Sequence, residues 1–242
     1  RDVYLLEAGP RAVKPEGVQI KTETIQDEYA VISVSAELEN KNPAVRKVIL
    51  KTEIIDAEGN TAACDEVPVV LFANSERKQT RRISISAPKL WSEKTPYLYS
   101  YKCTILDENK ENVIDSAEGT FGIRTLTVDS KNGIRVNGET VKLRGACIHH
   151  DSGLLGSATY EDAQYRQVKK LKEAGFNAIR MSHHPMAPAM LRACDRLGVF
   201  VMDELSDIWT RCKSDYDYGL SFTEQWPSDV KSMGRKDDNC PS

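Results

Sequence analysis

The chain has 242 residues, a formal net charge of −3 and 29% charged side chains, as expected for a globular protein of one or two domains. Acidic and basic residues are interspersed and form no basic face, so we expect no nucleic-acid partner. No apolar run approaches the ~20 residues that a membrane span needs, so we expect no membrane partner either.

Residues 1–123 are predicted to form an immunoglobulin-like β-sandwich. Apolar and polar side chains alternate over 18–25, 30–38 and 48–55, which is typical of strands with one buried face. Turn-forming residues separate these segments. Four more strands are expected at 67–72, 80–86, 98–106 and 113–123. Seven short strands without a helical stretch favour a sandwich of two sheets.

Residues 124–242 have a different pattern, in which strands and helices alternate. The expected elements are a strand at 141–147, a helix from a capping box at Thr159–Asp162 to Glu173, a strand at 177–181, a helix at 187–197 and a strand at 199–203. Gly175 and Gly198 follow the two helices, as C-terminal stops. Repeated helix–Gly–strand units indicate parallel strands with right-handed crossovers. A doubly wound sheet and a (β/α)8 barrel both fit this pattern.

Polar side chains follow each of the three predicted parallel strands. His149-His150 and His183-His184, which are all the histidines of the chain, come after the first two strands, and Asp203-Glu204 end the third. The carboxyl ends of parallel strands open onto one face, where the active sites of such folds lie. One histidine alone is as easily structural, but three converging strand ends predict a site.

The residues by themselves leave the chemistry of this site open. His and Asp are zinc ligands, although the spacing is not that of a closed metal site such as H-E-x-x-H. Asp203 and Glu204 are neighbours on a strand and point to opposite faces, so at most one enters a pocket. Glycoside hydrolysis needs two carboxyl groups facing each other across the scissile bond.

A family resemblance narrows these choices. The segment from Asn177 through Arg180 and His183-His184-Pro185 to Asp195-Arg-Leu-Gly198 resembles the first signature of glycoside hydrolase family 2, which includes β-galactosidases and β-glucuronidases. It departs from that signature at Met181 and His184. Further resemblances lie at the family's domain junctions: Arg1-Asp2-Val3, Leu90-Trp91-Ser92, Phe121–Arg124, Asn137-Gly138 and Leu143–Gly145. The implied fold is an immunoglobulin-like sandwich followed by an incomplete (β/α)8 TIM barrel.

The resemblance also implies roles for single residues. His183 is similar to the histidine that touches the sugar, and Arg180 to the arginine that keeps the nucleophile ionised, although a structural ion pair explains Arg180 equally well. His149 and Asp203 match pocket positions. Asp207 and Trp209 are expected to form a wall of the pocket. The other candidate substrate-binding residues are His150, Asp151, His184 and Glu204. No metal ligand and no cofactor are expected.

For the parent protein, the resemblance implies retaining hydrolysis of a β-linked sugar, with β-galactosidase favoured over β-glucuronidase. Asp237–Ser242 resembles the start of the family's second signature, so both catalytic Glu residues are expected beyond Ser242 and the chain alone is predicted to be inactive. A non-catalytic carbohydrate-binding or interaction module is the alternative, and a metal-dependent α/β hydrolase is a weaker one. The open edge after the third strand predicts possible homo-oligomers.

The cysteines bear on the compartment. All six are scattered, without a C-x-x-C pair, which predicts free thiols in a reducing, cytoplasmic environment. Because the first residue is Arg1 and not Met, a periplasmic or secreted parent stays an open alternative.

Overall fold

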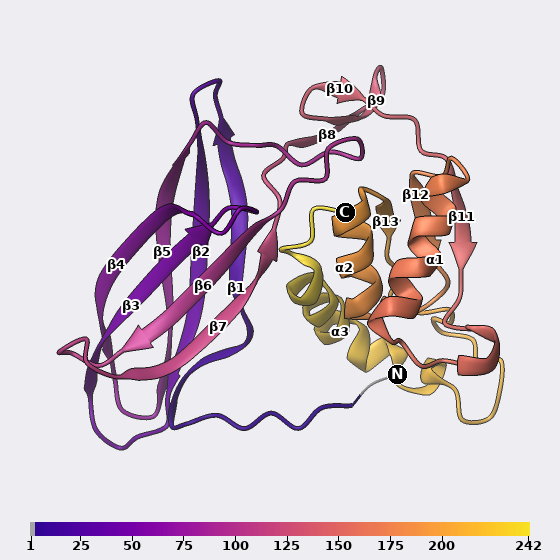
Figure 1. Cartoon of the computed structure of the whole chain (residues 1–242). Coiled ribbons are helices and arrows are strands. Elements are labelled where there is room, and N and C mark those ends of the chain that lie inside the picture. The colour runs from indigo at the N-terminus through magenta and orange to yellow at the C-terminus, as the bar shows by residue number, and fades with distance from the viewer. Residues whose placement is uncertain (1–2) are drawn as a thin grey trace.

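The computed structural model describes residues 3–242 (Figure 1). Arg1 and Asp2 of the N-terminal junction motif lie outside the described residues. The chain forms a β-sandwich and an α/β unit that lie side by side, and the C-terminal helix packs between them (Figure 1).

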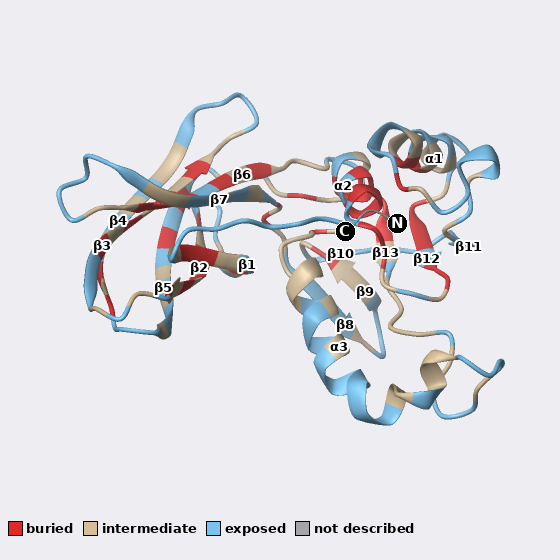
Figure 2. Cartoon of the chain, turned by 90° about the horizontal axis from the view of Figure 1, so that it is seen from below, coloured by how far each residue is buried: buried red, intermediate tan, exposed pale blue. Residues whose placement is uncertain are grey.

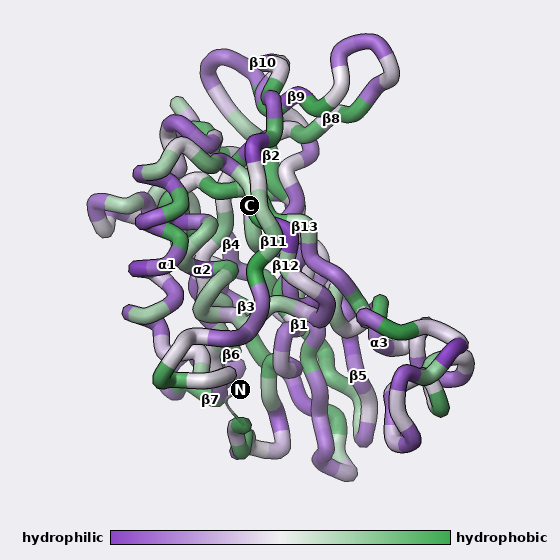
Figure 3. The backbone as a smooth tube through the Cα atoms, turned by 90° about the vertical axis from the view of Figure 1, so that its right-hand side faces the viewer, coloured by the Kyte–Doolittle hydropathy of each residue, from purple (hydrophilic) through white to green (hydrophobic). Residues whose placement is uncertain are grey.

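The sandwich has the seven strands that the alternating pattern predicts. They form two antiparallel sheets in the orders β1-β2-β5 and β4-β3-β6-β7. Buried residues alternate with more exposed ones along the strands, and the buried set from both sheets forms one apolar core (Figures 2 and 3). The strands are β1 (Arg11–Ile25), β2 (Tyr29–Asn40), β3 (Arg46–Ile55), β4 (Thr61–Leu71), β5 (Ser75–Ser86), β6 (Tyr99–Leu106) and β7 (Val113–Phe121).

A small three-stranded sheet connects the sandwich to the α/β unit. It consists of β8 (Leu126–Asp129), β9 (Gly133–Val136) and β10 (Glu139–Thr140), paired antiparallel. The predicted turn at Asn137-Gly138 joins the last two strands. Both residues have positive φ, 51° and 84°, which the Asn-Gly pair accommodates in a tight hairpin.

The α/β unit contains three parallel strands in the order β11-β12-β13, as predicted, and they do not close into a barrel. Helices α1 and α2 cover one face of the sheet, and the apolar core of the unit lies between them and the strands. The elements are β11 (Gly145–Ile148), η1 (Gly153–Leu155), α1 (Glu161–Glu173), β12 (Ala178–Met181), α2 (Pro188–Leu197), β13 (Phe200–Met202), η2 (Tyr218–Leu220) and α3 (Phe222–Asp237).

One local prediction for this unit is wrong. The strand expected at 141–147 begins only at Gly145, because the side chain of Asn177 binds this stretch instead of a ladder partner: it accepts from Arg144 N at 2.6 Å and donates to Lys142 O at 2.9 Å. Helix α1 begins after Tyr160, and two acidic residues in its first turn interact favourably with the helix dipole.

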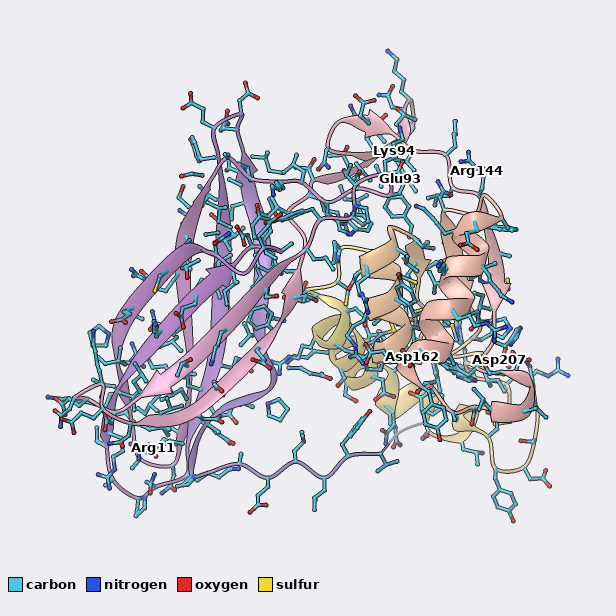
Figure 4. All side chains as sticks on the ribbon, viewed as in Figure 1. Arg11, Glu93, Lys94, Arg144, Asp162 and Asp207 are labelled. Carbon is cyan, nitrogen blue, oxygen red and sulfur yellow. The ribbon has the colours of Figure 1, made fainter. Side chains whose placement is uncertain are left out.

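The loop after β5 fixes the sandwich to the N-terminal end of the parallel strands. Trp91 in this loop is fully buried, and its Nε1 donates to the carbonyl oxygen of Asp195 at 2.9 Å. Lys172 Nζ donates to the carbonyl oxygens of Glu93 at 2.5 Å and Gly198 at 2.7 Å. Figure 4 shows Glu93 at this end of the α/β unit and Asp207 at the opposite end. The sandwich therefore leaves the carboxyl ends of the strands uncovered.

Candidate functional site

The carboxyl ends of β12 and β13 bring three of the predicted site residues into direct contact. Arg180 Nε donates to Glu204 Oε1 at 2.5 Å, and His183 Nδ1 lies 2.9 Å from Glu204 Oε2. From the end of β11, the ring of His149 meets that of His183 edge-on, with 5.4 Å between centroids. The carboxylate of Glu204 thus contacts both the guanidinium of Arg180 and the imidazole of His183. The second ring nitrogen of His183, Nε2, takes no part in this contact.

The charges of this cluster balance one another. Burial raises the pKa of Glu204, but the hydrogen bonds from His183 and Arg180 outweigh it and hold that pKa below its usual value. The same contact with Glu204 raises the pKa of Arg180, and a further contact with the Cys147 thiol adds to it. Glu204 is therefore an ionised partner of Arg180 at neutral pH and lacks the raised pKa of a general acid.

Arg180, His183 and Glu204 line a cavity of about 690 Å³, within the size range of small-ligand pockets. Asp207 and Trp209 extend it from the loop after β13, and Phe222 and Trp226 close it from α3. The rings of Trp209 and Phe222 are nearly parallel, 5° apart, with centroids 6.2 Å from each other. Flat, partly exposed aromatic faces beside ionised and hydrogen-bonding groups are suited to an amphipathic ring such as a sugar.

Asp203 occupies a different environment from its neighbour. Its carboxylate accepts from Met186 N at 2.8 Å and 3.1 Å and lies 3.4 Å from Lys236 Nζ, with 11% of the side chain exposed. It does not line the cavity that contains Glu204. The opposite directions of these two carboxylates follow from the alternation along an extended chain. The contacts of Asp203 indicate that it fixes the loop between β12 and α2.

Three other candidates, His150, Asp151 and His184, do not line this cavity. His150 and Asp151 lie between β11 and the short helix η1. His184 lines a second hollow, together with Pro185 and residues of α3. Asp207, by contrast, lines the cavity. Its carboxylate accepts a hydrogen bond from Lys213 Nζ at 2.6 Å, and this bond lowers the pKa of Asp207. Both carboxylates of the cavity are thus paired with cations.

Sequence reasoning did not identify Phe222 and Trp226 as residues of the cavity. Their spacing of four residues places them on one face of a helix, and that spacing was the available signal. Among residues 3–242, no three His, Cys, Asp or Glu side chains are grouped closely enough to hold a metal ion. Within the same residues, no helix combines the length and apolar character needed to cross a membrane.

Comparisons with known proteins show what both parts of the chain are similar to. Residues 13–124 match the model for glycosyl hydrolases family 2, and residues 127–215 match the model for the TIM barrel domain of that family. A β-galactosidase of Bacteroides ovatus is 35% identical over 242 residues, which are 100% of this chain and 28% of that protein. A putative β-glucuronidase of Formosa agariphila is 36% identical over 241 residues, 99% of this chain and 22% of that protein.

Solved structures agree with these matches. A family 2 member from Bacteroides cellulosilyticus superimposes with a TM-score of 0.92 and 38% identity, over 97% of this chain and 30% of that one. A β-glucuronidase of Bacteroides uniformis gives a TM-score of 0.85 and 25% identity, over 97% of this chain and 28% of that one. The chain spans only about a quarter of the length of the relatives it matches.

Proposed function

The chain belongs to glycosyl hydrolases family 2, and we propose that it supplies one wall of the sugar pocket of a retaining β-glycosidase. The observation that carries this proposal is the convergence of Arg180, His183 and Glu204 with Trp209 in one cavity at the carboxyl ends of parallel strands. We also propose that residues 1–123 form the sandwich domain and residues 124–242 the barrel part.

In this proposal the cavity residues bind and orient the sugar. Glu204 holds His183 so that the second ring nitrogen meets a sugar hydroxyl, while Arg180 presents its remaining N–H groups to the pocket. Trp209 lies against the apolar face of the ring. Hydrolysis with retention then proceeds through one Glu that attacks the anomeric carbon and another that protonates the leaving oxygen and activates water.

The charge balance of the cavity favours a neutral sugar over a uronate. The guanidinium of Arg180, the one Lys or Arg side chain that lines this cavity in the described residues, is already neutralised by Glu204. Asp207 is likewise paired with Lys213, so the lining offers no unpaired cation to a glucuronate carboxylate. We therefore propose a β-galactoside as the substrate ahead of a β-glucuronide.

The 242 residues are proposed to bind sugar without hydrolysing it. Both cavity carboxylates have lowered pKa values and cationic partners, so neither fits the role of a general acid. Calorimetric titration with methyl β-galactoside and methyl β-glucuronide is expected to give weaker binding of the uronate. Nitrophenyl β-galactoside should release no nitrophenol above the buffer control, whereas the Bacteroides ovatus β-galactosidase serves as the positive control. Turnover near the rate of that enzyme would overturn this part of the proposal.

A non-catalytic binding module in which the sandwich holds the sugar predicts a different result. The substitution Glu204→Gln removes the ionised partner of Arg180 and is expected to weaken galactoside binding if the cavity is the site. Unchanged galactoside binding in this variant would favour the sandwich as the sugar-binding part.

A further inference from the structure

A second hollow surface, which we call the basic groove, lies between the sandwich and α3. It has a volume of about 520 Å³ and is lined by Lys14, Glu37, Glu76, Arg77, Lys78, Ser228, Lys231, Ser232 and Arg235. The first five belong to β1, β2 and β5, and the last four to α3. This groove is separate from the cavity described above, with which it shares no residue.

The groove carries an excess of positive charge. Five of its side chains are cationic and two are acidic, in a chain whose net charge is −3. The two carboxylates are already paired: Lys14 Nζ lies 2.8 Å from Glu76 Oε1, and Arg235 NH2 lies 2.9 Å from Glu37 Oε1. Three cations therefore remain to face a ligand.

The three remaining cations have no carboxylate partner among the described residues. Arg77 donates to the carbonyl oxygen of Val70 at 3.1 Å, and Lys78 donates to Gln19 Oε1 at 3.3 Å. Lys231 is exposed on α3 and makes no ion pair within residues 3–242. Cations held together without counter-charge attract an anion with several oxyanion groups better than a single small ion.

The lining also indicates what kind of anion fits. No aromatic side chain is present in the groove, so the base stacking that single-stranded nucleic acids use has no platform. Two serine hydroxyls, of Ser228 and Ser232, suit a hydroxylated ligand. A further hollow links the two sites, because it shares Leu205 and Ser206 with the sugar cavity and Ser232 with the groove.

We propose that the basic groove binds an oligosaccharide that carries carboxylate or sulfate groups, at a position apart from the sugar cavity. The positive charge of the groove does not depend on the proposed function, whereas the carbohydrate nature of the ligand rests on it. Such a site would hold an acidic glycan chain against the face between sandwich and α3.

The test compares three probes by calorimetric titration of the 242-residue chain: a tetragalacturonate, a neutral galactose tetramer and inorganic sulfate. The tetragalacturonate is expected to bind most tightly, and its binding should weaken as ionic strength rises. In the double variant Lys78→Gln/Lys231→Gln, the affinity is expected to fall about five- to tenfold. Equal affinity for the neutral tetramer or for inorganic sulfate would overturn the proposal.

A matched control removes the same charge elsewhere. The double variant Lys131→Gln/Lys169→Gln changes two exposed lysines outside the groove and should bind tetragalacturonate as the original chain does. Equal weakening in both double variants would show a response to net charge alone and contradict a groove site. Glu204→Gln separates the two proposals, because a change in tetragalacturonate affinity in that variant would place the acidic ligand in the sugar cavity.

Discussion

Replacing Trp91 by Ala tests whether the sandwich and the α/β unit form one folded body. The indole is fully buried, meets the ring of Phe200 edge-on with 5.5 Å between centroids, and donates to the carbonyl oxygen of Asp195. Truncating a buried Trp to Ala costs about 3–5 kcal/mol, and a buried carbonyl left without its donor adds about 1–3 kcal/mol. We expect the free energy of unfolding to fall by about 4–8 kcal/mol, a large part of the total stability of a domain.

A second substitution separates the hydrogen bond from the packing. Trp91→Phe keeps an aromatic ring beside Phe200 but removes the donor to Asp195, so the expected loss is about 1–3 kcal/mol. Trp226→Phe, on the partly exposed side of α3, is the control and should change stability by no more than about 0.5 kcal/mol. Urea unfolding followed by far-UV circular dichroism measures all three. A loss below about 1 kcal/mol for Trp91→Ala would refute the reasoning.

Three further predictions concern charge and exposed surface. Burial raises the pKa of Asp195 to about 6, so its contribution to stability is full below the unfolded-state pKa near 4 and is lost as pH rises through 6. Asp195→Asn should therefore raise the melting temperature at pH about 8 but not at pH about 4; an equal shift at both would contradict this. Glu204→Gln removes the carboxylate that lies 2.9 Å from His183 Nδ1 and should change the chemical shifts of the His183 ring in NMR spectra; unchanged ring signals would argue against the contact. Met202→Lys places a charge on the exposed sheet edge and should reduce self-association in sedimentation experiments, if homo-oligomers form there; a dimer fraction equal to that of the unsubstituted chain would exclude this edge.

The strands could be predicted because burial imposes a period of two on their side chains. In β2 and β3 nearly every second residue is buried, and the sequence alternates accordingly. Helix α3 could not be predicted in this way. None of its residues is buried, it contains Pro227, and polar contacts hold its C-terminal end, such as the bonds of the Asn239 side chain to Ile20 N and Val18 O of β1. Those contacts come from residues more than two hundred positions apart.

The site was predictable as a location but not in its detailed contacts. Strand order places the residues after β11, β12 and β13 at one edge of the sheet. Alternation predicts that Asp203 and Glu204 diverge, yet it does not say which one faces the cavity. Met186 and Lys236 decide this, because they engage Asp203 on the other side. The contribution of Phe222 and Trp226 depends on where α3 packs, which no local pattern reveals.

The central claim, that the cavity at the strand ends binds a sugar, is tested most directly by the indole N–H signals of the three tryptophans in a ¹⁵N NMR titration with methyl β-galactoside. Trp209 and Trp226 line the cavity, whereas Trp91 is buried at the opposite end of the strands and serves as an internal control. We expect the signals of Trp209 and Trp226 to shift in a saturable way while that of Trp91 stays unchanged. No shift of Trp209 at saturating sugar, or a shift of Trp91 alone, would contradict the account.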